Sequence, residues 1–196
     1  MNDTLSFYQQ NAKAFIAGTV DVDMSAFYQR FLELIPPGAS ILDLGCGSGR
    51  DSKVFSDLGY RVTAMDGSVE LCKQAAQLTG FPVRCLLFEE LDYDREFDGV
   101  WACASLLHVE KEKMGAILDL VAASLKPGGI LYASYKYGSC QRRENGRFFS
   151  DYTEADIPAL FPESGPFTCI SWWINPDERP ERRNEKWLSL ICRKNG

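Results

Sequence analysis

The most informative stretch of the sequence is residues 45–49, in which every second residue is glycine. It directly follows a short apolar run, Ser40–Leu44, that is typical of a buried β-strand, and a helix is expected from about Asp51. Glycine lets the backbone turn tightly and approach a ligand closely, and the first turn of a helix offers unpaired N–H groups. The pattern predicts a loop that binds a nucleotide-like ligand outside the carboxyl end of the strand.

Acidic residues on either side of this loop indicate which ligand suits it. A dinucleotide fingerprint needs G-x-G-x-x-G, but Gly49 comes one residue early and Arg50 stands where the third glycine belongs. Asp43 precedes the loop by two residues, where it would disfavour a pyrophosphate and favour the cationic amino-acid end of S-adenosylmethionine. Asp66, at the expected end of the second strand, is placed to bind a ribose diol in either nucleotide class. The combination favours S-adenosyl-L-methionine as the cofactor.

Over about residues 39–136 the sequence resembles the class I S-adenosylmethionine-dependent methyltransferase superfamily. Residues 43–49 match its E/D-x-G-x-G-x-G signature, and Asp66 matches its ribose-binding acid. Residues 97–108 look like its fourth-strand motif, and residues 125–129 look like the turn before its fifth strand. The glycine loop and the short N-terminal helices look most like the tellurite-resistance and small-molecule methyltransferase branch. The resemblance implies methyl transfer from S-adenosyl-L-methionine.

The resemblance also implies a set of cofactor-binding residues at the ends of the first four strands. For the adenine end it leaves two readings open, because Glu89 can contact the adenine amine or Phe88 can supply a backbone N–H and an apolar wall. The predicted cofactor-binding residues are Asp43, Gly45, Cys46, Gly47, Gly49, Arg50, Asp66, Gly67, Ser68, Phe88, Glu89, Ala102, Cys103 and Ala104.

Three residues are candidates for acting on the methyl acceptor, and two of them, His108 and Tyr8, have a structural alternative. His108, the sole histidine, can act as a general base near pH 7 or simply start a helix through a backbone contact. Tyr135 ends the fifth strand and is expected to face the cleft. Tyr8 on the first helix either closes over the cofactor or packs in the core. Cys103 is flanked by alanines and is expected to be a small buried side chain rather than a nucleophile.

The last third of the chain contains arginines interleaved with tryptophans. We expect Lys136, Arg147, Arg179 and Trp172 to contact the acceptor, because guanidinium groups suit carboxylate, phosphate and oxyanion recognition. The alternative is a solvated surface in which these cations pair with neighbouring glutamates. The first reading predicts a small, anionic acceptor.

The spacing of apolar residues predicts the elements that position these groups. Two helices are expected before residue 36, followed by alternating strands and helices up to Tyr135 and by two closing strands, Phe167–Ile174 and Trp187–Cys192. This order predicts an α/β fold, a doubly wound, seven-stranded, mostly parallel sheet with two N-terminal helices. We expect one methyltransferase domain over residues 1–196, with a helical lid (1–38), a cofactor-binding core (39–136) and an acceptor-side part with the closing hairpin (137–196).

Composition limits the possible partners and compartments. A net charge of −6 argues against general nucleic-acid binding, and no apolar run is long enough to cross a membrane. The start of the chain lacks the features of a signal peptide, and the seven scattered cysteines contain no CxxC motif, so we expect a cytoplasmic protein with reduced thiols and no metal. An RNA (tRNA) methyltransferase and a non-catalytic S-adenosylmethionine-binding protein remain the alternatives. The sequence leaves a monomer and a homodimer equally open.

Overall fold

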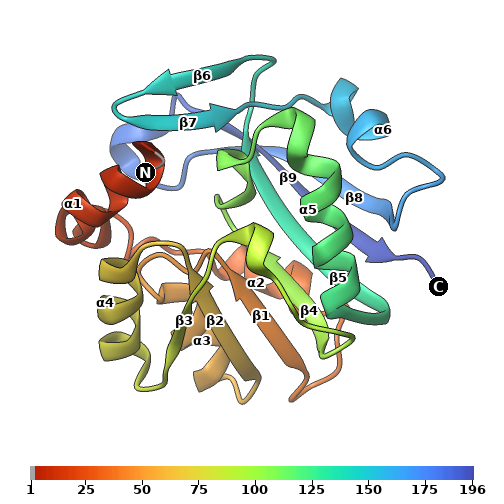
Figure 1. Cartoon of the computed structure of the whole chain (residues 1–196), viewed down its shortest axis with the longest axis horizontal. Helices are drawn as coiled ribbons and strands as arrows, with labels where there is room; N and C mark the ends of the chain where they lie inside the picture. Colours follow the sequence, from red (N-terminus) through yellow and green to blue (C-terminus); the bar gives the residue numbers. More distant parts are fainter. Residues whose placement is uncertain (1–2) are drawn as a thin grey trace.

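The computed structural model describes residues 3–196, so Met1 and Asn2, part of the expected N-terminal lid, lie outside the described residues. Its main feature is a seven-stranded sheet in the order β3-β2-β1-β4-β5-β9-β8 (Figure 1). Only β9 runs antiparallel to the other six strands. This confirms the predicted α/β fold with a mostly parallel sheet and an antiparallel closing strand. The strands of this sheet are β1 Ser40–Leu44, β2 Arg61–Asp66, β3 Val83–Cys85, β4 Phe97–Ala102, β5 Leu125–Lys136, β8 Phe167–Pro176 and β9 Lys186–Lys194.

Helices cover both faces of the sheet, as expected for a doubly wound fold (Figure 1). Successive strand residues point to opposite faces. Leu42 and Val100 therefore pack in the cluster that contains α5, whereas Ile41 and Trp101 pack with aromatic residues of α2 and α3. The helices are α1 Asp3–Ala17, α2 Ser25–Leu32, α3 Arg50–Asp57, α4 Val69–Thr79, α5 Lys111–Ser124 and α6 Ile157–Leu160, with short 3-10 turns η1 Phe88–Glu90, η2 Leu106–His108, η3 Glu154–Asp156 and η4 Pro180–Arg182.

The predicted order of elements is confirmed, the two closing strands lie within two residues of their expected bounds, and side-chain caps fix the start of two helical segments. The Ser68 hydroxyl accepts a hydrogen bond from the Leu71 N–H at the start of α4, and Asp156 accepts one from the Thr153 N–H before α6. Strand β3 spans only Val83–Cys85, and the chain turns into η1 after Leu87. Among residues 3–196, no helix is long and apolar enough to cross a membrane.

One element was not predicted. The polar segment after β5 forms a β-hairpin of β6 (Gln141–Glu144) and β7 (Arg147–Ser150), which pair outside the main sheet. Its turn, Asn145-Gly146, has positive φ at both residues (49° and 76°), the conformation of a tight type I′ hairpin. The Asn145-Gly146 pair was the available sequence signal for this hairpin. The charged residues beside it do not alternate with apolar residues, which is the pattern that would have indicated strands.

The hairpin and α1 lie together over the carboxyl ends of the parallel strands (Figure 1). The Arg143 guanidinium pairs with the Asp3 carboxylate at 2.6 Å, and the Phe148 N–H donates to the Thr4 hydroxyl at 2.9 Å. Helix α1 is kinked at Asn11, where φ and ψ are −114° and 15°. These contacts place α1 and β7 as a roof over the edge of the sheet where a ligand is expected.

Candidate cofactor and acceptor site

A cavity of about 1220 Å³ lies under this roof, at the carboxyl ends of β1, β2, β4 and β5. Ligand pockets of single small molecules typically span about 300–1,000 Å³. The cavity therefore has room for a cofactor and a second small molecule side by side. Its walls come from the glycine loop on one side and from α1, η2, the β6–β7 hairpin and the β8–β9 connection on the other.

The glycine loop needs its glycines for close approach. Gly45 has φ of 81°, and a Cβ atom there would lie 2.4 Å from the Ser105 Cβ, so no other residue fits without displacing the chain. The loop is held by β2, because the Gly45 and Cys46 N–H groups both donate to the Met65 carbonyl at 2.9 Å. Residues Gly45 to Ser48 consequently form the floor of the cavity.

The Asp66 carboxylate joins the loop to the next strand. It accepts hydrogen bonds from the Gly47 N–H (3.0 Å) and the Ser68 N–H (2.8 Å), one on each oxygen. Burial raises the pKa of this carboxyl, and the backbone hydrogen bonds oppose the rise. Each oxygen keeps a lone pair that can accept from a hydroxyl in the cavity, which is the chemistry that a ribose diol requires.

A buried hydroxyl beside the loop is another sign of a ligand. The Ser105 Oγ has no hydrogen-bond partner among the described residues, although its residue is buried in the cavity wall. Buried polar groups are normally hydrogen-bonded, so an unpartnered one at a cavity wall suits a polar ligand atom. Together with Asp66, the loop and the apolar wall of Leu87 and Phe88, it fits S-adenosyl-L-methionine. When bound, that molecule supplies a methyl carbon made electrophilic by its sulfonium.

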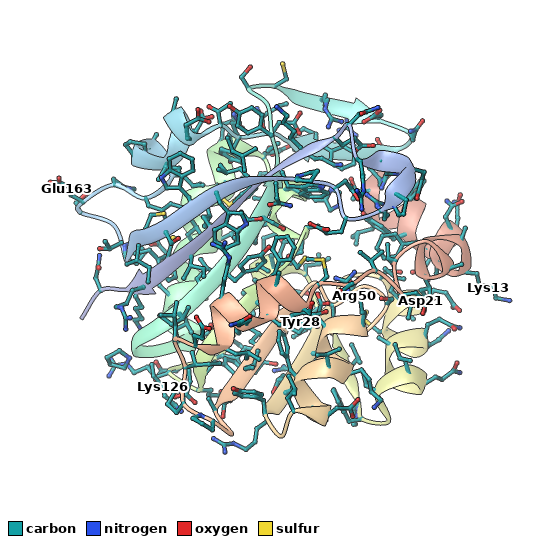
Figure 2. The ribbon with its side chains drawn as sticks, turned by 180° about the vertical axis from the view of Figure 1, so that it is seen from behind. Lys13, Asp21, Tyr28, Arg50, Lys126 and Glu163 are labelled. Atoms are coloured by element: carbon teal, nitrogen blue, oxygen red, sulfur yellow. The ribbon has the colours of Figure 1, made fainter. Side chains whose placement is uncertain are left out.

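A buried ionic network centred on Asp51 lies at the start of helix α3, directly after the glycine loop. Arg50 donates to both Asp51 oxygens, at 2.6 and 3.0 Å, and also to the Thr19 carbonyl. Asp51 further accepts from the Tyr28 hydroxyl at 2.5 Å and from the Trp101 indole at 2.7 Å. Burial alone would raise the pKa of Asp51, but Arg50 and these donors lower it. Figure 2 shows, from the side opposite to Figure 1, Tyr28 on α2 and Arg50 beside the segment that joins α1 to α2.

The structure brings most of the predicted cofactor residues to the cavity wall. Four of them do not reach it. Ala102 and Ser68 are buried, and Gly49 packs on α4, where a Cβ atom would meet Ala75 at 3.0 Å. Asp43 is only 2% exposed and accepts a hydrogen bond from the Ser52 hydroxyl at 2.6 Å. The residues that do line the cavity are Gly45, Cys46, Gly47, Arg50, Asp66, Gly67, Phe88, Glu89, Cys103 and Ala104.

Asp43 therefore lies behind the loop and does not line the cavity, and an effect on the cationic end of the cofactor stays a prediction. Burial, and next the charge of Asp51, raise the pKa of Asp43 to about 8. The side chain is mostly neutral at pH 7 and supports the loop through Ser52 instead. The sequence shows an acidic residue at position 43 but does not show whether its side chain faces the cavity or the interior.

The raised pKa of Asp43 predicts a pH effect on stability. Folded Asp43 keeps its proton up to about pH 8, whereas an unfolded aspartate releases it near pH ~4. The folded state binds more protons between these values, so the free energy of unfolding falls as the pH rises. In Asp43→Asn, which cannot ionise, we expect the melting temperature to fall less between pH 5 and pH 8 than in the native protein. Thermal unfolding followed by circular dichroism measures this, and an equal fall in both proteins would contradict it.

His108 and Tyr8 meet in the cavity. The Tyr8 hydroxyl lies 2.9 Å from His108 Nε2, and His108 Nδ1 lies 2.6 Å from the Phe148 carbonyl oxygen on β7. Burial lowers the pKa of His108 to about 4, so the ring is neutral at pH 7. His108 Nε2 contacts Tyr8, so His108 does not meet an acceptor directly, and its role as a general base stays a prediction. The Phe148 carbonyl is part of the site that no sequence signal identified.

Two other predicted acceptor residues do not face the cavity. Tyr135 is 0% exposed, its hydroxyl contacts the Met114 sulfur, and its ring packs on Tyr152. It lies on the α5 face of β5, opposite to Lys136, because neighbouring strand residues point to opposite sides. Trp172 lies on the edge strand β8 and is 48% exposed, away from the cavity wall.

The remaining predicted cations line the cavity but differ in whether they are paired. Lys136 forms ion pairs with Asp177 and Glu185 and stacks on Trp187, and the Arg179 guanidinium is held by Asp177 at 2.6 Å. Hydrogen bonds from Arg179 and Trp187 lower the pKa of Asp177 against the effect of its burial. Both cations are therefore neutralised within the protein.

Arg147 is different. No described carboxylate forms an ion pair with it, its Nε is buried without a hydrogen-bond partner among residues 3–196, and its guanidinium lies over the rings of Phe7 (4.5 Å) and Phe149 (5.1 Å). Of the other described cations in the wall, only the exposed Lys186 lacks a carboxylate partner; the paired ones are Arg50, Lys113, Lys136, Arg142, Arg143, Arg179 and Arg182. Arg147 is thus the one partly buried cation of the cavity that is available to a ligand.

Comparison with known proteins agrees with this site. Residues 41–129 match the model of a family described as a methyltransferase domain. The chain is 36% identical over 103 residues to a ubiquinone biosynthesis O-methyltransferase of Nitrobacter winogradskyi, which covers 50% of this chain and 38% of the relative. It is 33% identical over 128 residues to a 2-methyl-6-phytyl-1,4-hydroquinone methyltransferase of Synechocystis, covering 61% of this chain and 39% of the relative. The matches thus span less than half the length of these curated relatives.

A solved structure resembles almost the whole chain. It is the 1,6-didemethyltoxoflavin-N1-methyltransferase of Burkholderia thailandensis with bound 1,6-didemethyltoxoflavin and S-adenosylhomocysteine, with a TM-score of 0.76 and 27% identity over 98% of this chain and 85% of that one. The DhpI–S-adenosylhomocysteine complex has a TM-score of 0.71 at 24% identity, which shows a shared fold. The matched segment, the glycine loop and the fold thus resemble those of class I S-adenosylmethionine-dependent methyltransferases.

Proposed function

We propose that this protein transfers a methyl group from S-adenosyl-L-methionine to a small, anionic organic molecule. The observation that carries the proposal is Arg147, an unpaired, partly buried guanidinium in the cavity wall next to Tyr8 and His108. A buried cation is costly unless a negative group pairs with it, so an anionic ligand relieves the cost when it binds. Arg147 would hold the acceptor while the glycine loop, Asp66 and Ser105 hold the cofactor.

The names of the relatives support an organic acceptor. They include ubiquinone biosynthesis O-methyltransferases, a hydroquinone methyltransferase and, among solved structures, a toxoflavin-precursor methyltransferase. These names give no support to tellurite, which the sequence resemblance had suggested. The room left in the cavity is also that of a small molecule rather than of a folded RNA.

Methyl transfer from tritium-methyl S-adenosyl-L-methionine into a fractionated cell lysate tests the proposal. The fractions are RNA, protein, and small molecules divided by anion exchange into neutral and acidic pools. We expect label in the acidic small-molecule pool. Label confined to RNA would instead support an RNA methyltransferase, and cofactor binding by calorimetry without any labelled fraction would support a non-catalytic binding protein. Either of these results would overturn the proposal.

A further inference from the structure

We propose that the Tyr8 hydroxyl contacts the reacting atom of the acceptor, that this atom is a hydroxyl oxygen, and that its proton leaves through Tyr8 to His108. The inference rests on the proposed function and adds to it the atom that is methylated and the path of its proton. In this scheme Tyr8 is a catalytic residue. His108 acts through Tyr8 and is a positioning residue that also receives the proton.

The direction of each hydrogen bond follows from the Phe148 carbonyl. A carbonyl oxygen can only accept, so His108 Nδ1, 2.6 Å away, must carry the hydrogen of the neutral ring. Nε2 then has no hydrogen and can only accept, so the Tyr8 hydroxyl, 2.9 Å away, must donate its single hydrogen to it. The Tyr8 oxygen then has only lone pairs to offer, and it shares them between the nearby Arg147 guanidinium and the cavity.

A hydroxyl oriented in this way selects what can bind against it. It can accept a hydrogen bond but has no hydrogen left to give, so it pairs with a ligand atom that carries a hydrogen. An O–H group that donates to Tyr8 turns a lone pair away from Tyr8, where it is free to attack. An aliphatic amine would be protonated at neutral pH, and the nearby positive charge of Arg147 would repel it.

The surrounding charges are compatible with this role. The charged groups that act on Tyr8 are Arg147 from β7, Asp66 from β2 and Arg179 from the β8–β9 connection. Burial raises the pKa of Tyr8, and Arg147 opposes this most strongly. Tyr8 therefore stays protonated at pH 7 and keeps donating to His108.

The step balances without a further reactant. The acceptor oxygen forms a bond to the methyl carbon as the carbon–sulfur bond breaks, and the electrons of that bond stay on sulfur. The acceptor proton passes to the Tyr8 oxygen while the Tyr8 proton passes to His108 Nε2, and Nδ1–H keeps its bond to the Phe148 carbonyl. A His108 pKa of about 4 suffices for this, because an oxygen that is gaining a methyl group is strongly acidic. The proton then leaves to water, which restores the neutral ring.

The chain offers a direct test of the resting arrangement, because His108 is its only histidine. Long-range proton–nitrogen correlation spectra of the ligand-free protein labelled with ¹⁵N-histidine contain one imidazole. We expect the Nδ1–H tautomer and no titration between pH 5.5 and pH 8, and we expect Tyr8→Phe to shift the Nε2 resonance. An Nε2–H tautomer, or titration near the ordinary pKa of about 6.5, would overturn the inference even if methyl transfer occurs.

The second test uses the acidic small-molecule pool of the lysate as acceptor, at concentrations where label uptake reports kcat/KM. In the native protein we expect kcat/KM to be independent of pH from 5.5 to 8. In Tyr8→Phe we expect a loss of about 100-fold or more at pH 7 and a rate that rises with pH, because the acceptor must then ionise in solution. Tyr60→Phe, away from the cavity, is the matched control and should behave as the native protein.

The outcomes separate the two proposals. Methyl transfer with a flat, undiminished profile in Tyr8→Phe, or a product whose mass and NMR spectra place the methyl group on nitrogen or carbon, would overturn the inference and leave the proposed function standing. If no pool is labelled while the spectra show the expected tautomer, the proposed function fails, and with it the proton path that rests on it.

Discussion

Replacing Asp66 with alanine is expected to weaken the binding of S-adenosylhomocysteine by about 100- to 10,000-fold. Hydrogen bonds to a charged group contribute about 1.5–3 kcal/mol each, and a ribose diol can donate two to this carboxylate. Asp66 also accepts from the Gly47 and Ser68 N–H groups, so its loss loosens the glycine loop as well. Isothermal titration calorimetry measures the dissociation constant, and circular dichroism checks that the variant is folded.

The control for this variant is Asp57→Ala. Asp57 is an exposed carboxylate on α3 that pairs with Lys53 on the same helix, and such surface pairs contribute little. We expect its affinity for S-adenosylhomocysteine to match that of the native protein. A folded Asp66→Ala variant that binds as tightly as the control would show that the ribose lies elsewhere.

Replacing Arg147 with alanine is expected to lower kcat/KM for the acidic small-molecule pool by about 30-fold or more. Removing one partner of a buried, hydrogen-bonded charge pair costs about 2–5 kcal/mol. The affinity for S-adenosylhomocysteine should stay unchanged, because Arg147 lies on β7, on the roof opposite the glycine loop. Arg147→Lys should restore the activity only in part, since an ammonium group cannot form a bidentate pair with a carboxylate. Label uptake and calorimetry on the same preparations measure both quantities.

The matched control is Arg61→Ala, which removes an exposed arginine at the amino end of β2, far from the carboxyl ends that form the cavity. Its activity should equal that of the native protein. Undiminished label uptake in Arg147→Ala would remove the basis for an anionic acceptor, whereas a joint loss of activity and cofactor affinity would indicate a role for Arg147 in holding α1 in place.

The sequence by itself determined the features that depend on local chain chemistry. The strand, the alternate glycines and the following helix lie within residues 40–57, so their backbone preferences could be read directly. The same holds for the cap at Ser68 and for the alternation of strands and helices that produces a doubly wound sheet. These features were enough to predict the fold and most of the residues that line the cofactor side of the cavity.

Only the tertiary structure decided which way side chains point. Period-two alternation along β5 means that Tyr135 and Lys136 cannot share a face, but the sequence does not say which one meets the cavity. The placement of α5 against one face settles it, because Tyr135 is buried there with Met114. Asp43 on β1 is likewise buried, and its side chain points to Ser52 rather than to the cavity.

Long-range pairing also decided which cations are free. In sequence Lys136, Arg147 and Arg179 look alike, yet Asp177 and Glu185 neutralise the first and Asp177 the third. The contact of Tyr8 with His108 joins residues 100 positions apart, and Phe148 completes it from a hairpin that closes over the sheet. Such contacts depend on where whole elements dock, so local propensity determined the cofactor loop whereas docking determined the acceptor side of the site.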